Sequence, residues 1–209
     1  MTVNNPNTDE EKLALMRKYP FLRLRSVFTG KQIHSGKHLN LMYNHYDEFK
    51  GTGWENLWKK YLDHLFKSYD SWDKDTRKHF QFLEIKEKYG TMRIYTSFST
   101  DDEDIAEMLS EFTCYNCGKQ PVDENGHHVI WKSTGYILPF CKECAEKFPD
   151  NHYTKECLDN TYAITSYRKE GKFRIEYIEK DGWLVKGEPV KIPERDDNGD
   201  PIHEEENRN

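Results

Sequence analysis

The sequence predicts an α+β protein in which an aromatic helix packs on β-hairpins, followed by a zinc ribbon and a small C-terminal β meander. Residues 54–69 carry apolar side chains at helical spacing, and residues 80–98 alternate in polarity around a Tyr-Gly pair. Four cysteines form two Cys-x-x-Cys pairs. The 5 Trp, 13 Tyr and 11 Phe of the 209 residues can fill a core although the mean hydropathy is −1.00.

The N-terminal part of the chain gives weaker patterns. Residues 1–11 are polar and are predicted to be a disordered N-terminus whose last residues cap a short helix. This helix should bury Met16 and end before Pro20, because the residue before proline disfavours helical geometry. Alternating apolar residues at 22–28 and 39–43 then suggest two strands.

The aromatic helix is the clearest element. Thr52 and Glu55 have the spacing of a capping box, in which each side chain bonds the other residue's backbone N–H. One apolar stripe should follow from their spacing on a helix, made of Trp54, Leu57, Trp58, Tyr61, Leu62, Leu65, Phe66 and Tyr69. The opposite face carries mixed charge, which favours core packing over a membrane-surface helix.

Three further groups of elements complete the expected fold. A hairpin is predicted from strands 80–88 and 91–98, and Thr100 with Glu103 should cap a second amphipathic helix that runs to Phe112. Strands at 162–168, 173–178 and 183–185 would make the meander. The expected organisation is a disordered N-terminus 1–11, an α+β domain 12–112, a zinc ribbon 113–148, a meander 149–193 and a disordered acidic tail 194–209.

Charge is distributed unevenly along the chain, whose formal net charge is −6. No acidic residue occurs from Lys12 to Tyr46, and this stretch has a net charge of +7. It is either a solvated face balanced by acids or a surface for an anionic partner. The candidate partner-binding residues are Arg23, Arg25, Lys31 and Lys37.

The cysteine spacing predicts a metal centre. Cys114 and Cys117 form one pair, Cys141 and Cys144 form the other, and 23 residues separate the pairs. Two such knuckles supply four thiolates in the closed tetrahedral arrangement of structural zinc, with Gly118 at a turn position that favours positive φ. Disulfides and a rubredoxin-like iron centre are the alternatives, and Cys157 has no partner in the pattern.

Other chemistries fit the sequence less well. The segment 30–37 has five residues between its glycines where a phosphate-binding P-loop has four, and His38 follows it where a P-loop has Ser or Thr, so we expect no nucleotide cofactor. His127 and His128 lie between the knuckles, as the catalytic hairpin of a zinc-containing HNH nuclease does. The expected Asn before the second knuckle is absent, and Ala145 follows Cys144 directly. We therefore predict no catalytic residues.

The segment from Gly53-Trp54 to Gly118 resembles a set of small uncharacterised proteins of bacteriophages and prophages. Its signature is Gly53-Trp54 at the start of an aromatic helix, the hairpin run Ile85-Lys-Glu-Lys-Tyr-Gly-Thr-Met-Arg-Ile-Tyr95, and Cys114-Tyr-Asn-Cys117-Gly118. The resemblance covers about a third of the chain. It implies a phage or prophage origin, a location in the host cytoplasm and, as such proteins often do, an action on a host factor.

The leading functional hypothesis is a non-enzymatic zinc-ribbon binding protein that engages, and by binding inhibits, a host protein or nucleic acid. The alternative is an HNH-like metal-dependent nuclease or a degenerate relative of one. No apolar run approaches the ~20 residues of a membrane-spanning helix, and no basic-then-apolar signal sequence is visible. We therefore expect a cytoplasmic protein without a membrane partner.

Overall fold

The computed structural model describes residues 14–23, 28–29, 31, 48–148, 150, 152–158, 163–181 and 183–193. The expected N-terminal disorder, the strand at 39–43 and the acidic tail 194–209 lie outside the described residues. The chain divides into two compact units, Met1–Leu158 and Asp159–Asn209. Helices and strands are both well represented, and the strands form several small sheets, so the α+β prediction is confirmed.

The first described segment confirms the predicted short helix before Pro20 and differs from the strand predicted after it. Residues 14–18 are helical and a 3-10 helix, η1 (Pro20–Leu22), follows directly, so Leu22 does not begin a strand. Phe28 lies in a turn and is 92% exposed. The alternation misleads here because Phe21 packs among aromatic rings, with its centroid 5.1 Å from that of Tyr69. This tertiary contact outweighs a weak local pattern.

The aromatic helix α3 (Glu55–Ser71) confirms the predicted stripe, of which Phe66 alone is half-buried. The reciprocal capping box does not form. The Glu55 carboxylate accepts from the Gly51 N–H at 2.9 Å, and the Thr52 hydroxyl accepts from the Trp54 N–H at 3.2 Å. These two bonds still satisfy backbone donors at the start of the helix, by a different local route.

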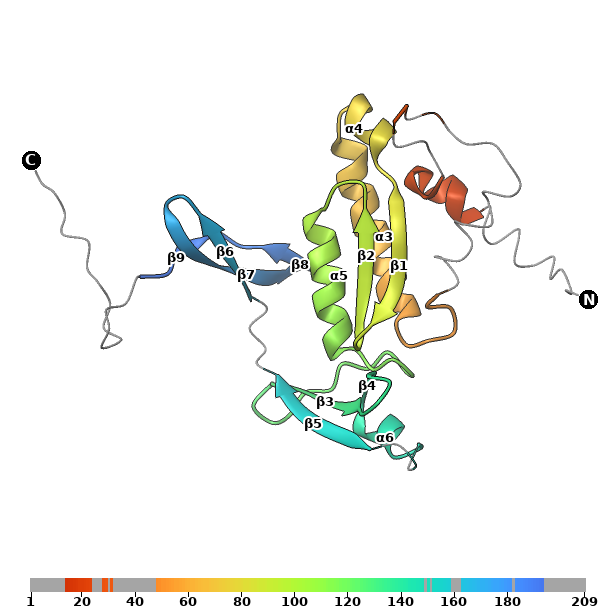
Figure 1. Ribbon diagram of the computed structural model, residues 1–209, viewed down its shortest axis with the longest axis vertical. Helices are drawn as coiled ribbons and strands as arrows, with labels where there is room; N and C mark the ends of the chain where they lie inside the picture. The colour runs from red at the N-terminus through yellow and green to blue at the C-terminus, as the bar shows by residue number, and fades with distance from the viewer. Residues whose placement is uncertain are drawn as a thin grey trace, which may run out of the picture. The chain divides into compact units, whose positions relative to one another are not determined.

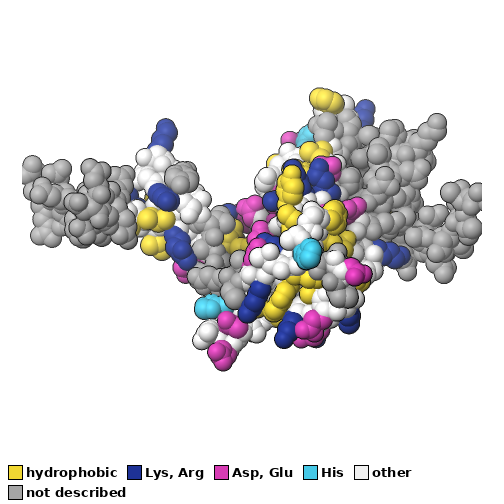
Figure 2. Space-filling view, turned by 60° about the horizontal axis from the view of Figure 1, so that its bottom comes forward, with side chains coloured by type: hydrophobic (Ala, Val, Ile, Leu, Met, Phe, Trp, Pro, Cys, Tyr) yellow, Lys and Arg dark blue, Asp and Glu magenta, His cyan; other side chains and the backbone are white. Residues whose placement is uncertain are grey.

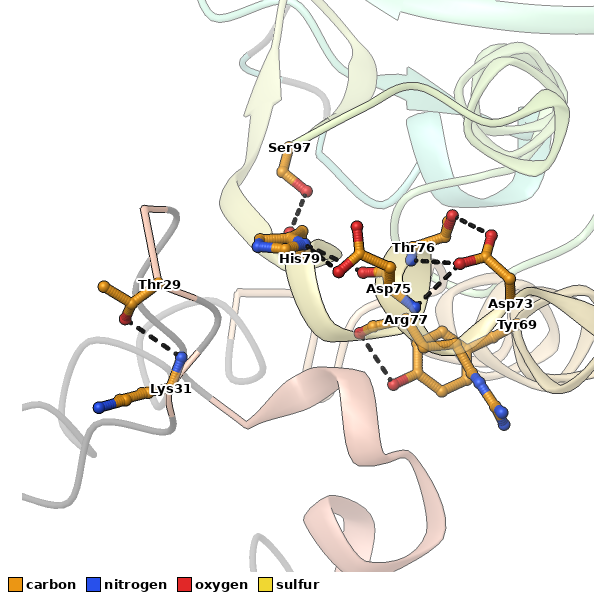
Figure 3. A network of polar contacts seen from close by, with 9 residues as sticks. All are labelled: Thr29, Lys31, Tyr69, Asp73, Asp75, Thr76, Arg77, His79 and Ser97. Carbon is orange, nitrogen blue, oxygen red and sulfur yellow. Dashed lines mark hydrogen bonds and ion pairs between the residues drawn. The ribbon is translucent and has the colours of Figure 1, made fainter.

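A short helix, α4 (Lys74–His79), is an addition to the predicted elements. Asp73 caps it, because its carboxylate accepts from the backbone N–H groups of Asp75 and Thr76. Figure 3 shows how α4 is attached on both sides. The Tyr69 hydroxyl of α3 donates to the Arg77 carbonyl at 3.2 Å, and the Ser97 hydroxyl donates to the carbonyl of His79 at 2.9 Å.

The predicted hairpin consists of β1 (Phe82–Lys88) and β2 (Thr91–Thr96). Tyr89 and Gly90 form its two-residue turn with φ values of 54° and 77°, the pattern of a type I′ turn. Figure 1 shows α3 and the second amphipathic helix, α5 (Asp101–Phe112), lying alongside this hairpin. The core between them is mainly aromatic and includes Trp58, Tyr61, Phe80, Phe82, Met92 and Ile105.

The cysteine region and one strand beyond it form a second, separate sheet of the first unit. Its antiparallel sheet has the order β4-β3-β5, from β3 (His128–Ser133), β4 (Pro139–Phe140) and β5 (Tyr153–Leu158), and α6 (Lys142–Ala145) follows β4. β5 lies in the range expected for the meander, but it pairs with β3 along its whole length. Local spacing cannot reveal such a long-range pairing.

The second unit contains the predicted meander. Its strands are β6 (Ala163–Arg168), β7 (Gly171–Lys180) and β8 (Trp183–Lys186), and β9 (Val190–Lys191) pairs with β7 as an unexpected addition. All pairings are antiparallel. In both units, no described helix has the length and apolar character needed to cross a membrane.

Candidate metal centre

The first knuckle begins where α5 ends. The Cys114 N–H donates to the Lys119 carbonyl at 2.8 Å, and the Gly118 N–H donates back to the Cys114 carbonyl at 2.8 Å. Gly118 has a φ of +75°, which confirms the predicted turn position. Both bonds fold the chain so tightly that the side chains of Cys114 and Cys117 face the same point.

The second knuckle is the start of α6. Cys141 is its N-cap residue, and the Cys141 carbonyl accepts from the N–H groups of Cys144 and Ala145 at 3.1 and 2.9 Å. The two knuckles are joined by a bond from the Tyr115 N–H to the Pro139 carbonyl, at 2.7 Å. Residues far apart in the sequence are thereby brought to one place.

The four thiol sulfur atoms converge as the spacing predicts. All lie within 4.8 Å of one another, and the cysteines are free. The Sγ atoms of Cys117 and Cys141 are 3.6 Å apart. A tetrahedral ion with Zn–S bonds of about 2.3 Å would set neighbouring sulfurs about 3.8 Å apart, so the donor set fits a metal ion of this kind.

The environment of the four sulfurs is asymmetric. Cys114, Cys141 and Cys144 are buried, whereas Cys117 is exposed. Burial raises the pKa of the Cys114 thiol and that of the Cys141 thiol. The Asn116 amide donates a hydrogen bond to the Cys144 Sγ at 3.2 Å, the kind of outer contact that orients a metal-binding thiolate.

A small apolar cluster supports the cysteines. Phe140 and Ala145 are buried with them, and the partly buried Trp131 and Tyr153 pack against this group. Few large side chains are available in this cluster, so a metal cross-link would supply cohesion that apolar burial alone supplies in larger cores.

The start of α3 contacts the first knuckle, an approach that the sequence pattern does not predict. The Gly53 N–H donates to the Tyr115 carbonyl at 2.5 Å, and the Trp54 indole N–H donates to the Thr113 carbonyl at 2.9 Å. The signal was present in the sequence as a Gly-Trp pair before the helix. Nothing local, however, relates that pair to a motif some 60 residues later.

The two histidines between the knuckles differ in environment. His128 is buried and stacks on Phe112, with the ring centroids 4.6 Å apart. Burial lowers the pKa of His128 below its usual 6.5. His127 is at the surface, with its Nδ1 3.6 Å from an Asp123 carboxylate oxygen. The structure thus places His128 in the core, where it packs rather than faces a substrate.

The proposed partner-binding cations are only partly described, since Arg25 and Lys37 lie outside the described residues. The half-buried Arg23 donates from its Nε to the Met16 carbonyl at 3.3 Å. Lys31 is exposed, and its backbone N–H donates to the Thr29 hydroxyl (Figure 3). On the face in Figure 2, Lys and Arg are interspersed with Asp and Glu among the described residues.

Cys157 lies within β5, where its backbone pairs with Val129.

No protein-family model matches the chain, and neither a curated protein nor a solved structure is significantly similar to it.

Proposed function

We propose that the protein is a non-enzymatic zinc-ribbon binding protein whose four-cysteine centre is structural. The observation that carries the proposal is the convergence of Cys114, Cys117, Cys141 and Cys144, whose donor atoms all lie within 4.8 Å of one another. Four thiolates occupy all four coordination positions of a tetrahedral zinc ion and leave none for water or substrate. Bound zinc would supply a cross-link between the knuckles and no reaction chemistry.

We propose zinc and not iron because the site is suited to a structural role. Zinc has no redox chemistry and is the common ion of closed four-thiolate sites that stabilise small folds. The small apolar cluster around the cysteines is consistent with a fold that depends on such an ion.

The partner is proposed from the charge distribution and from the resemblance. A basic stretch at 12–46 is suited to an anionic surface of a host protein or to nucleic acid. The likeness of residues 53–118 to phage and prophage proteins supports a phage origin, a cytoplasmic location in the host and inhibition of a host factor. The buried position of His128 gives no support to an HNH nuclease.

Elemental analysis of the purified full chain tests the metal centre. We expect one zinc per chain, lost in the variant Cys141→Ser and kept in Cys157→Ser, which makes the same chemical change outside the cluster. Absence of zinc after refolding in its presence, or a disulfide among the four cysteines, would refute the proposal. Incubation with DNA and RNA in magnesium should leave both intact; cleavage lost in His127→Ala would favour the nuclease instead.

A further inference from the structure

The backbone of Gly53 is seated directly on the first knuckle. Besides the bond from its N–H to Tyr115, a Cβ atom at this position would lie 2.1 Å from the Cys114 carbonyl oxygen and 2.2 Å from the Gly118 nitrogen. Real Cβ atoms do not approach other heavy atoms this closely. Only glycine therefore allows the chain before α3 to contact the backbone of a cysteine-bearing turn.

Trp54 makes the second contact. Its side chain is fully buried, its indole N–H bonds the Thr113 carbonyl, and its ring meets that of Tyr115 edge-on with centroids 5.0 Å apart. The carbonyls of residues 113 and 115 stand on either side of Cys114. The Thr113 carbonyl accepts from Trp54 and the Tyr115 carbonyl accepts from Gly53, the two residues that lead into α3.

The conformation of the turn 114–119, which Gly53 and Trp54 contact, depends on the cysteine cluster. The turn from 114 to 119 exposes Asn116, Cys117 and Lys119 to solvent, so apolar burial does little to hold it. A metal ion bound by both knuckles would fix the turn against the start of α6. Without an ion, only the backbone hydrogen bonds of Cys114, Tyr115 and Gly118 and the contacts with residues 53–54 offset the chain entropy of holding the six-residue turn in one shape.

The later turns of α3 are held differently. Tyr61, Leu62 and Leu65 are fully buried, and Tyr61 packs on Phe82 of the hairpin with centroids 6.1 Å apart. The Tyr69 hydroxyl bonds α4 through the Arg77 carbonyl. These contacts involve no part of the knuckle.

We propose that metal binding at the four-cysteine cluster controls the docking of Gly53 and Trp54, so that loss of the metal releases the start of α3 while its later turns stay packed. The inference rests on the proposed function, since it requires that the cluster binds a metal. Coupling of this kind is reciprocal: docking of Gly53 must strengthen metal binding by the same factor by which the metal strengthens docking.

Hydrogen–deuterium exchange of the full chain, with and without a zinc chelator, tests the release. We expect the hydrogen-bonded amides of residues 53–55 to exchange at least about tenfold faster after chelation and those of 61–69 to change less than about twofold. Metal content is measured on the same samples. The inference is overturned, and the metal centre is not, if zinc is removed without faster exchange at residues 53–55, or if exchange at 61–69 accelerates equally. Failure to bind zinc at all overturns both.

A second measurement uses the reciprocal effect. Gly53→Ala introduces the clashing Cβ, and we expect it to weaken zinc affinity at least about tenfold in competition with a chromophoric chelator. The matched control is Gly51→Asn, because a Cβ at Gly51 meets nothing within 4 Å and asparagine tolerates its φ of +76°. Equal affinity in the Gly53→Ala variant and the wild type contradicts the coupling. If the alanine variant does not fold, exchange of the wild-type chain decides alone.

Discussion

The buried carboxyl group of Glu103 should make the protein less stable as the pH rises. Glu103 is 5% exposed on α5, and burial raises its pKa from 4.5 to about 7. Hydrogen bonds from the Thr96 hydroxyl and the Thr100 backbone lower the pKa by less than burial raises it, and Asp104 and Glu107 on the same helix raise it further. The elements packed against it present the Tyr61 hydroxyl of α3 and the Thr96 hydroxyl of β2 and no described cation that lowers its pKa.

The contacts of the Thr96 hydroxyl can be satisfied when the Glu103 carboxyl group is protonated. The Thr96 hydroxyl has one proton, yet it lies 2.5 Å from a Glu103 carboxyl oxygen and 2.8 Å from the Phe98 carbonyl. One proton cannot serve both acceptors. If the carboxyl group is protonated, it donates to the Thr96 oxygen, and Thr96 donates to Phe98, so that both short contacts are satisfied.

The sign and size follow from proton linkage. Between pH 4.5 and 7 the folded state binds more protons at Glu103 than the unfolded state does, so the stabilisation present at low pH is lost as the pH rises through 7. At about 1.36 kcal/mol per pKa unit, the loss between pH 5 and pH 8 is about 2.5 kcal/mol. The neutral variant Glu103→Gln should not show this loss.

Urea denaturation followed by far-UV circular dichroism at 222 nm reports α3 and α5 directly. The quantity to compare is the free energy of unfolding of the wild type minus that of Glu103→Gln, measured at pH 5 and pH 8 with zinc in excess. Taking this difference removes the effects of pH on the metal centre, because they are common to both proteins. We expect this difference to fall by about 2.5 kcal/mol. Glu124→Gln makes the same chemical change in an exposed turn. A difference that is the same at both pH values refutes the reasoning.

Three further predictions test the packing. Ser110→Ala removes the hydroxyl oxygen that accepts from the buried Met92 N–H at 2.8 Å and should cost about 1–3 kcal/mol in urea denaturation; a cost below about 0.3 kcal/mol would show that the bond is dispensable. Gly118→Ala places a side chain at a φ of +75° and 2.7 Å from the Gly53 carbonyl oxygen, so it should cost at least about 1–2 kcal/mol, and an unchanged thermal midpoint would contradict this. Truncation after Pro193 removes the polar acidic tail and should leave the thermal midpoint unmoved; a clear drop would mean that the tail docks on the rest of the chain.

The sequence was informative where the residues within one element form a pattern that marks its buried positions. The stripe of α3 repeats over several turns, and the Tyr89-Gly90 turn fits between two alternating runs, so both could be located without long-range knowledge. The cysteine pairs were equally direct, because ligand spacing within a knuckle is a local property.

Elements that depend on distant partners could not be found in this way. The pairing of β3 with β5 joins residues about 25 apart, and the Gly53 contact with the first knuckle joins residues more than 60 apart. Near Leu22 the period of two was accidental, since Phe21 is placed by an aromatic cluster formed with α3 and β1. In each case the deciding interaction lies outside the window that a pattern covers.

Side chains of α5 accept hydrogen bonds from backbone N–H groups of β2, and this limits the number of strands in the hairpin sheet. The outward N–H groups of Met92 and Ile94 donate to the Ser110 hydroxyl and the Glu107 carboxylate, at 2.8 and 2.9 Å. An open strand edge would offer these donors to the backbone of another chain. Here the helix occupies the place of a third strand, so this side of the hairpin is closed to strand addition and to the edge-to-edge association that leads to aggregation.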